Sequence, residues 1–263
     1  MEKVEPQPSA SAILMESVAA GSLQDPAATV LADINWKVMP GDFWVVAGLQ
    51  GSGKSDLLML TAGLMAPLSG QYWLFDEEMP IFDEARLPQR LRLGLVFESG
   101  QLFNHLTVRE NLALPLRYHQ NLTKSEAATR VKAMLDAMEL TPWADTTPGA
   151  LGRNWHKRIG LARALMLRPE ILLVDNPLAS LDPSHIYWWL GMLERLSKGE
   201  NLVRKDPLTL IVTTADLRPW MGLARQFAVL NQQRMKVLRD RAQVEAASDE
   251  LVGELFAPEP RHD

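Results

Sequence analysis

The amino-acid sequence predicts an α/β protein with a mainly parallel sheet and a helical insert. Short apolar runs rich in β-branched residues recur along the chain, and helical patterns separate several of them, which is typical of a parallel sheet. A glycine-rich segment at 48–55 joins the first of these runs to a helical pattern. More than seventy residues between 97 and 170 carry almost no strand signal, which predicts the helical insert.

The individual elements follow from residue type and spacing. The expected strands are short apolar runs at 41–48, 91–97, 170–175, 208–213 and 227–230. One helix is expected at 55–64, directly after the glycine-rich segment. A second helix is expected at 122–140, where apolar residues at 131, 134, 135 and 138 share one face and Pro142 follows.

Composition narrows the class of protein. A chain of 263 residues is long enough for one domain with a subdomain, and 47% hydrophobic with 22% charged residues is ordinary for a globular protein. The net charge of −5 argues against broad electrostatic binding to nucleic acid, so no nucleic-acid partner is expected. The absence of cysteine excludes disulfides and thiolate metal sites. No apolar run approaches the ~18–20 residues needed to cross a bilayer.

The ends of the chain differ in composition from its middle. Residues 1–12 are polar and lack the basic-then-apolar pattern of a signal peptide, so we expect a disordered tail and a cytoplasmic protein. The main domain is expected at 13–239, with a helical subdomain at about 100–158. Residues 240–263 are charged, Ala-rich and then Pro-rich, which predicts a C-terminal extension with a peripheral helix and a loose end.

The segment "GLQGSGKS" at 48–55 matches the phosphate-binding pattern G-x-x-x-x-G-K-[ST] between a predicted strand and helix. Its glycines allow backbone N–H groups to wrap phosphates, and the N-terminus of the following helix adds partial positive charge. Lys54 would reach the β- and γ-phosphates, and the Ser55 hydroxyl would ligate Mg²⁺. The alternative is a glycine-rich turn that binds nothing. The predicted nucleotide-binding residues are Gly48, Leu49, Gln50, Gly51, Ser52, Gly53, Lys54, Ser55 and Asp56.

Two carboxylates modify this picture. Asp56 suits the helix dipole in the first helical turn, but it would also stand close to bound phosphate and repel it. Asp175 ends the apolar strand at 170–175 and is predicted to hold Mg²⁺, although an ordinary strand-end Asp is the alternative.

The order of these motifs resembles the ATP-binding subunit of ABC transporters. "LVFESGQLFNHLTVRENLALPLR" at 95–117 stands between the glycine-rich loop and "LGRNWHKRIGLARALMLRPEILLVDNPLASLD" at 151–182, and the likeness runs from about 13 to 235. The resemblance implies a P-loop NTPase core of RecA-like type, a small N-terminal antiparallel β part, and ATP with Mg²⁺ as cofactors. Residues 98–117 most resemble the ATPases of Mla/Mce-type lipid transporters.

Three positions depart from the family pattern near the expected phosphates. Asn176 stands where the family has its general-base Glu, and the loss of that base should slow hydrolysis by about 10²–10⁴-fold. Thr214 stands at the position of the switch His and cannot act as an imidazole. Glu98 replaces the Q-loop glutamine, where it either ligates Mg²⁺ or is simply solvated.

The family's signature loop, which contacts the ATP of a second subunit, corresponds to Leu151, Gly152, Arg153, Asn154 and Trp155. Arg153 and Trp155 are bulky where backbone would have to approach phosphate. Either the Arg153 guanidinium supplies charge to the γ-phosphate, or the segment is a relaxed surface loop. Ser180, Leu181 and Asp182 match the D-loop that bridges two sites, and a capped turn before a helix explains them equally well.

The general-base and switch-His positions are altered, and so is the signature loop that would contact the ATP of a second subunit. The resemblance therefore implies that neither a homodimer nor a heterodimer contains an undamaged site. It also implies an ABC-type subunit with weak or lost hydrolysis, associated with a lipid-type transporter. Its implied partners are a second ABC ATPase subunit and an integral membrane permease bound through 98–117, at the inner face of the plasma membrane. The alternatives are a working transport ATPase with rearranged residues and a soluble ABC protein acting on DNA or ribosomes.

Overall fold

The main sheet of the computed structural model has six strands in the order β10-β9-β3-β8-β7-β6. The structure describes residues 11–22, 25, 28–79, 84–200, 206–247 and 250–256. The strands of this sheet are β3 (Phe43–Ala47), β6 (Leu93–Val96), β7 (Ile171–Val174), β8 (Thr209–Thr214), β9 (Gln226–Asn231) and β10 (Arg234–Leu238). All pairs are parallel except β9 with β10. The predicted parallel sheet and its five expected strands are confirmed, and β10 is an additional antiparallel edge strand.

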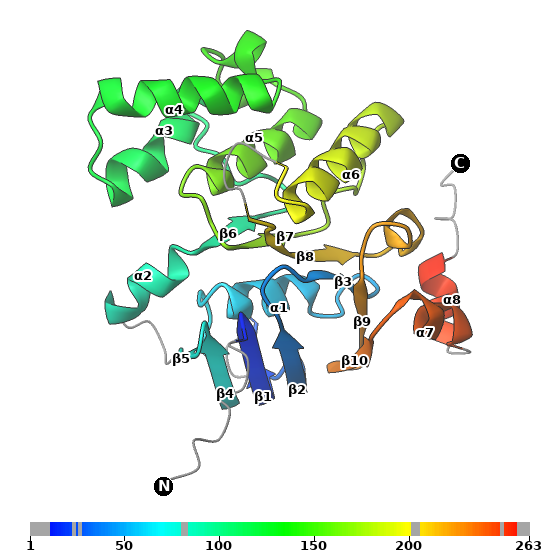
Figure 1. The fold of residues 1–263 in the computed structure, drawn as a ribbon. Helices are drawn as coiled ribbons and strands as arrows, with labels where there is room; N and C mark the ends of the chain where they lie inside the picture. The colour runs from blue at the N-terminus through cyan, green and yellow to red at the C-terminus, as the bar shows by residue number, and fades with distance from the viewer. Residues whose placement is uncertain are drawn as a thin grey trace, which may run out of the picture.

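A second, smaller sheet is antiparallel and has the order β2-β1-β4-β5. Its strands are β1 (Ile13–Ala20), β2 (Leu31–Val38), β4 (Ser69–Leu74) and β5 (Glu77–Glu78). This sheet is the small N-terminal antiparallel part that the family resemblance implied. Figure 1 shows it below the main sheet.

Helix α1 (Lys54–Thr61) lies between the two sheets. Because strand side chains alternate between faces, β3 directs Trp44 and Val46 into the core around α1. The same strand directs Val45 and Ala47 into the core on its other face. The glycine-rich loop joins β3 to α1. Because the side chains of β3 are buried in both cores, the start of this loop is held in a fixed position.

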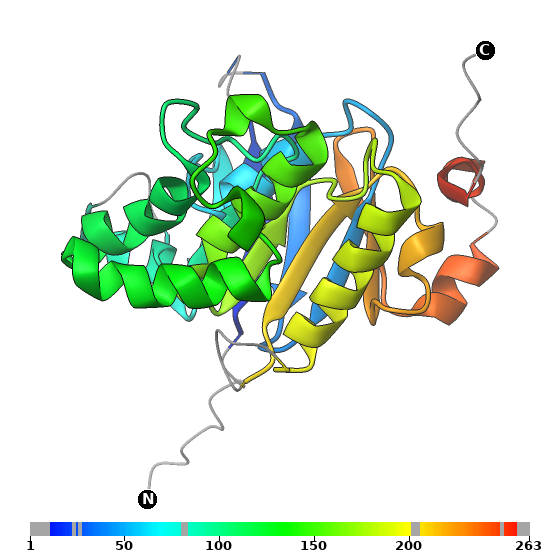
Figure 2. The ribbon, with the colours of Figure 1, turned by 90° about the horizontal axis from the view of Figure 1, so that it is seen from above.

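Helices α5 (Arg153–Leu165) and α6 (Pro183–Ser197) cover the second face of the main sheet (Figures 1 and 2). Helices α3 (Val108–His119) and α4 (Lys124–Ala137) lie to one side of them, and α3 packs on α5. Thr107 and Thr123 begin α3 and α4 with capping boxes, in which the Thr side chain and a Glu three residues later satisfy each other's backbone N–H groups. The helix expected at 122–140 is confirmed as α4. No described helix is long and apolar enough to span a bilayer.

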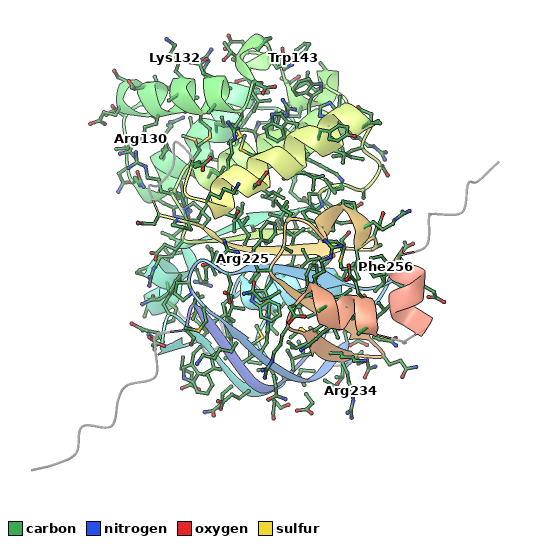
Figure 3. The ribbon with its side chains drawn as sticks, turned by 45° about the vertical axis from the view of Figure 1, so that its right-hand side comes forward. Arg130, Lys132, Trp143, Arg225, Arg234 and Phe256 are labelled. Carbon is green, nitrogen blue, oxygen red and sulfur yellow. The ribbon has the colours of Figure 1, made fainter. Side chains whose placement is uncertain are left out.

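The remaining short elements connect these layers. They are α2 (Leu87–Arg90) and the 3₁₀ turns Glu84–Arg86, Thr141–Trp143, Pro148–Ala150 and Arg218–Trp220. Figure 3 shows Lys132 and Trp143 in the helical layer and Arg234 at the opposite end of the molecule.

The two ends of the described chain pack more closely than the sequence suggests. Residues 1–10 of the expected tail lie outside the described residues, but Ala12 is buried and its N–H donates to Val38 O at 2.9 Å. The expected peripheral helix is two short helices, α7 (Arg241–Ala246) and α8 (Glu250–Phe256), beside β9 and β10. Leu255 of α8 is fully buried, so α8 contributes to the core. The expected loose end at 257–263 lies outside the described residues.

Candidate functional site

The glycine-rich loop leaves the end of β3 and turns into α1. Gly51 and Gly53 have φ angles of 78° and 91°, in the left-handed region that glycine adopts most easily. A Cβ at Gly48 would lie 2.4 Å from Ser52 Oγ, closer than any real contact. The loop therefore depends on glycine both for its turns and for its internal packing.

A cavity of about 430 Å³ opens over this loop. Its lining residues are Gln50, Gly51, Gly53, Lys54, Ser55, Asp56, Glu98, Asp175, Asn176, Ser180 and Ala215. They follow the carboxyl ends of β3, β6, β7 and β8, the edge at which open parallel sheets bind ligands. The volume falls within the ~300–1,000 Å³ range of small-molecule sites.

Lys54 is the cation of this cavity. Its Nζ donates to Gly48 O at 2.7 Å and to Leu49 O at 2.8 Å, which occupies two of its three N–H donors. Burial lowers the pKa of Lys54, while the carboxylates of Asp175 and Glu98 oppose that shift. One donor remains for an anionic ligand such as a phosphate oxygen.

Ser55 and Asp175 form the oxygen pair of the cavity. Ser55 Oγ donates to Asp175 Oδ2 at 2.7 Å, and Thr213 Oγ1 donates to Asp175 Oδ1 at 2.7 Å. The described residues contain no group of three or more His, Asp or Glu side chains able to enclose a metal alone. One carboxylate and one hydroxyl fit Mg²⁺, which usually takes one or two carboxylates and completes its shell with phosphates and water. The residues present therefore fit a magnesium nucleotide.

Asn176 and Glu98 lie side by side in the same cavity. Asn176 Nδ2 donates to Glu98 Oε2 at 3.2 Å, although the two residues are 78 positions apart. The Asn176 backbone has a φ angle of 41°, and its N–H donates to Thr213 Oγ1 at 3.0 Å. The residue that follows Asp175 thus carries an amide, and this amide is hydrogen-bonded to the carboxylate of Glu98.

Thr214, which is predicted to stand at the position of the switch His, lies at the end of β8 and does not line this cavity. The Thr214 hydroxyl donates to Asp216 O at 2.9 Å and accepts from Asp216 N–H at 3.1 Å, which closes a turn at the end of β8. Ala215, not Thr214, lines the cavity. Its methyl side chain can neither hold nor transfer a proton.

The segment that corresponds to the signature loop comprises Leu151, Gly152, Arg153, Asn154 and Trp155. Its last three residues form the first turn of α5, and the segment contacts its own chain. Asn154 Nδ2 donates to Asp182 Oδ2 at 3.0 Å, and the Trp155 ring lies 5.2 Å from the His185 ring, centroid to centroid. Arg153 is exposed. None of the five residues lines the cavity described above. Asn154 is held by its hydrogen bond and Trp155 by its ring contact, so these two residues are not part of a loose surface loop.

The segment that matches the D-loop serves as the cap of α6. Asp182 accepts hydrogen bonds from Ser184 Oγ at 2.6 Å and from His185 N–H at 3.1 Å, and these bonds hold its pKa below the usual value. Leu181 packs against the helical core. Ser180, with a φ angle of 57°, lines the cavity. The capped turn is present, and it also brings one side chain to the site.

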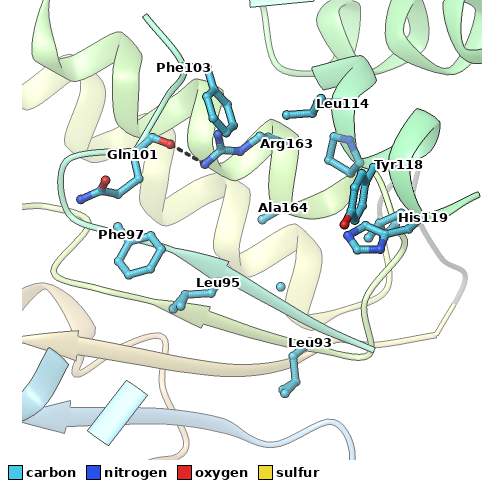
Figure 4. Close-up of a pocket in the computed structure, with 13 residues that line it drawn as sticks. Leu93, Leu95, Phe97, Gln101, Phe103, Leu114, Tyr118, His119, Arg163 and Ala164 are labelled. Atoms are coloured by element: carbon cyan, nitrogen blue, oxygen red, sulfur yellow. Dashed lines mark hydrogen bonds between the residues drawn. The ribbon is translucent and has the colours of Figure 1, made fainter. Parts of the chain in front are cut away.

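A second, mostly apolar cavity of about 450 Å³ forms a groove between β6, α3 and α5 (Figure 4). Its lining residues are Leu93, Gly94, Leu95, Phe97, Gln101, Phe103, Leu114, Pro115, Tyr118, His119, Arg163, Ala164 and Leu167. The segment 98–117, which we expect to bind a partner, supplies part of this lining. The sequence did not predict the contribution of α5, from which Arg163 donates to Gln101 O at 2.8 Å.

The loop before this groove is tightly packed on α5. Gly100 has a φ angle of 77°, and a Cβ there would lie 2.3 Å from His156 O. A Cβ at Gly160 would lie 3.1 Å from Gly100 Cα. The two glycines therefore allow the backbone of the loop to touch the helix directly.

Comparisons with known proteins agree with this fold and show the family. The family model described as ABC transporter matches residues 31–179. An ABC transporter ATP-binding protein of Methanosarcina acetivorans is 34% identical over 220 residues, which cover 80% of this chain and 76% of that protein. A spermidine/putrescine import ATP-binding protein of Chromobacterium violaceum is 31% identical and is covered over 55% of its length. A methionine import ATP-binding protein of Yersinia pestis is 30% identical and is covered over 59%. The chain thus spans little more than half the length of these import proteins.

Two solved structures have the same architecture. The dimeric post-hydrolysis state of the ATP-binding cassette MJ0796, bound to ADP and Pi, superposes with a TM-score of 0.75 at 25% identity, over 86% of this chain and 99% of that one. The cbiO1 protein of Clostridium perfringens, part of the cbiONQ complex, superposes with a TM-score of 0.76 at 22% identity, over 90% and 91%. The second likeness concerns the fold alone.

Proposed function

The chain belongs to the ABC transporter family of ATP-binding proteins, and on that premise we propose that it is a transporter subunit that binds Mg-ATP but hydrolyses it slowly. The observation that carries the proposal is the position of Asn176. Its amide lines the cavity beside the Ser55–Asp175 pair and donates to Glu98. An amide can orient a water molecule but cannot take its proton at neutral pH.

The residues around the cavity divide the work of binding. The loop glycines and Lys54 would hold the phosphates, because Gly51, Gly53 and Lys54 line the cavity and one ammonium donor of Lys54 remains for a ligand. Ser55 and Asp175 would hold Mg²⁺, which neutralises phosphate charge when bound, and Glu98, which lines the same cavity, would join them. Asn176 would hold a water near the phosphates, and Ala215 offers no proton carrier in place of a His.

The alternative function, a working ATPase with rearranged residues, is favoured by one observation. Glu98 Oε2 lies 3.2 Å from Asn176 Nδ2, so a carboxylate is present one hydrogen bond away from the usual position. In that case removal of the Glu98 carboxylate abolishes turnover.

We propose two protein partners. The dimeric structure of MJ0796 supports a second ATP-binding subunit, and Ser180, which lines the cavity, and exposed Arg153 are the groups that would face it. The groove of Figure 4 supports a membrane subunit, because Phe103 and Tyr118 expose 46% and 76% of their surface beside it. A lipid cargo is supported only by the resemblance of 98–117. The named relatives import polyamines and methionine.

The experiment is a titration of the purified protein with Mg-ATP, followed by tryptophan fluorescence and by calorimetry. Lys54→Ala should abolish binding at physiological ATP, whereas Lys198→Ala, at the exposed C-terminal cap of α6, should not change it. Phosphate release measured on the same samples should then be slow. Wild-type protein that binds no Mg-ATP at millimolar concentration contradicts the proposal, and so does binding that survives Lys54→Ala.

A further inference from the structure

Lys157 of α5 is a buried cation without a carboxylate partner among the described residues. Only 6% of its surface is exposed. Its Nζ donates to three backbone carbonyls, Asn176 O at 3.2 Å, Pro177 O at 3.4 Å and Ala179 O at 2.7 Å. A lysine ammonium group has three N–H donors, so these three oxygens use its full capacity.

We propose that Lys157 is a positioning residue for the nucleotide cavity, which holds the backbone of 176–179 so that Asn176 and Ser180 face the ligand. This inference rests on the proposed function. Lys157 lines neither cavity, so its effect on the site must pass through the backbone that it binds.

The segment 176–182, whose first part Lys157 binds, contains two non-glycine residues with left-handed backbone angles. Asn176 and Ser180 have φ angles of 41° and 57°, and non-glycine residues keep such angles only where their surroundings hold them. The bonds within the segment are long, with Ala179 N–H to Asn176 O at 3.3 Å and Leu181 N–H to Leu178 O at 3.3 Å. The ammonium contact of 2.7 Å to Ala179 O is shorter and charge-assisted, and so is the stronger restraint.

A second contact from the same helix fixes the far end of this segment. Asn154 Nδ2, one turn before Lys157, donates to Asp182 Oδ2 at 3.0 Å. The first two turns of α5 therefore hold the segment on both sides of Ser180. Burial lowers the pKa of Lys157, while the carboxylates of Glu98 and Asp175 oppose that shift.

The neighbouring residue supplies a matched control. Arg158 is also buried, at 4% exposure, but it points away from the cavity. Its guanidinium lies over the Trp188 ring at 3.7 Å from the centroid and donates to Glu139 Oε2 at 3.1 Å. Arg158→Met therefore removes a buried cation from the same helix without touching the segment 176–182.

The test compares Lys157→Met with Arg158→Met by calorimetric titration with Mg-ATP and by hydrogen exchange of the peptide 175–182. Lys157→Met should weaken Mg-ATP binding about tenfold or more, the usual effect of losing a residue that orients a ligand-holding group, and should speed exchange of that peptide. Arg158→Met should lower the melting temperature but change neither readout more than about twofold. Lys157→Gln, which keeps two amide donors, should retain more affinity than Lys157→Met and serves if the latter does not fold.

Three results would overturn the inference. They are unchanged exchange of 175–182 in Lys157→Met, unchanged Mg-ATP affinity in that variant, and an equal loss of affinity in Arg158→Met. Failure of the proposed function looks different, because wild-type protein would then bind no Mg-ATP. The exchange measurement on nucleotide-free protein would still report whether Lys157 holds the segment.

Discussion

The contact between Asn176 and Glu98 makes Asn176→Glu a less simple repair than the family pattern suggests. A Glu at 176 would return a general base, which is worth about 10²–10⁴-fold in rate, or roughly 3–5 kcal/mol. It would also place a second carboxylate next to Glu98, whose Oε2 lies 3.2 Å from the Asn176 amide. Two such charges at about 4 Å repel by about 1 kcal/mol in water and about 4 kcal/mol at the effective dielectric constant of a protein surface.

Because Glu98 is exposed, the repulsion should lie near the lower end of that range, at about 1–2 kcal/mol. Asn176→Glu should therefore raise the rate of phosphate release, and the double variant Glu98→Gln with Asn176→Glu should raise it about 5- to 30-fold further. The assay is phosphate release at saturating Mg-ATP, with the Mg-ATP affinity measured separately. A single variant as fast as the double variant would refute the reasoning.

The backbone at 176 requires its own control. Asn tolerates the φ angle of 41° better than Glu does, so the substitution should destabilise the fold by about 1 kcal/mol or somewhat more. Asn176→Gln carries the same strain without the charge. Asn176→Glu should melt a few degrees below Asn176→Gln, because only the Glu side chain is repelled by Glu98, and only Asn176→Glu should gain turnover. If Glu98→Gln alone abolishes a measurable wild-type turnover, Glu98 supplies the carboxylate of a working ATPase.

Three further substitutions test other parts of the site and core. Burial raises the pKa of Asp56, so the folded protein binds this proton more tightly than the unfolded chain and loses stability as the pH rises above the unfolded pKa. Asp56→Asn should therefore raise both the melting temperature and the Mg-ATP affinity at pH 7. The gain in melting temperature should vanish below about pH 4, where Asp56 is protonated in both states. Gly53→Ala should lower stability by about 2 kcal/mol, seen as a fall in melting temperature, because φ is 91° and the new Cβ would lie 2.9 Å from Leu31 Cδ2, whereas Gly149→Ala, with no atom within 4 Å, should have little effect. Trp189→Ala should cost about 3–5 kcal/mol in denaturant unfolding because its side chain is fully buried, and a loss under 1 kcal/mol would contradict the packing described.

Local patterns predicted most of the main sheet but little of the smaller one. The strands β3, β7 and β8 are buried on both faces and therefore read as continuous apolar runs. Strand β1 has irregular register near Ser17, whose φ angle of 49° interrupts the alternation of buried and exposed residues. Strand β10 is an edge strand with mostly exposed or half-exposed residues, so its apolar signal is weak.

The contacts that define the site were predictable only in part. The loop, Lys54, Ser55 and Asp175 follow from a motif and a strand end, because the chain places them locally. The pairing of Glu98 with Asn176 and the contact of Lys157 with Ala179 O depend on how β6, β7 and α5 pack together, which no short-range pattern records.

The direct packing of Gly100 on α5 gives the two cavities a common wall. Glu98 faces the nucleotide cavity and Gln101 faces the groove, and the glycine contact with α5 lies between them on the same segment. A displacement of this segment by an occupant of the groove would also move Glu98 and so alter the other cavity. Linkage requires the effect to be equal in both directions, so the factor by which a groove ligand changes nucleotide affinity is also the factor by which nucleotide changes affinity in the groove.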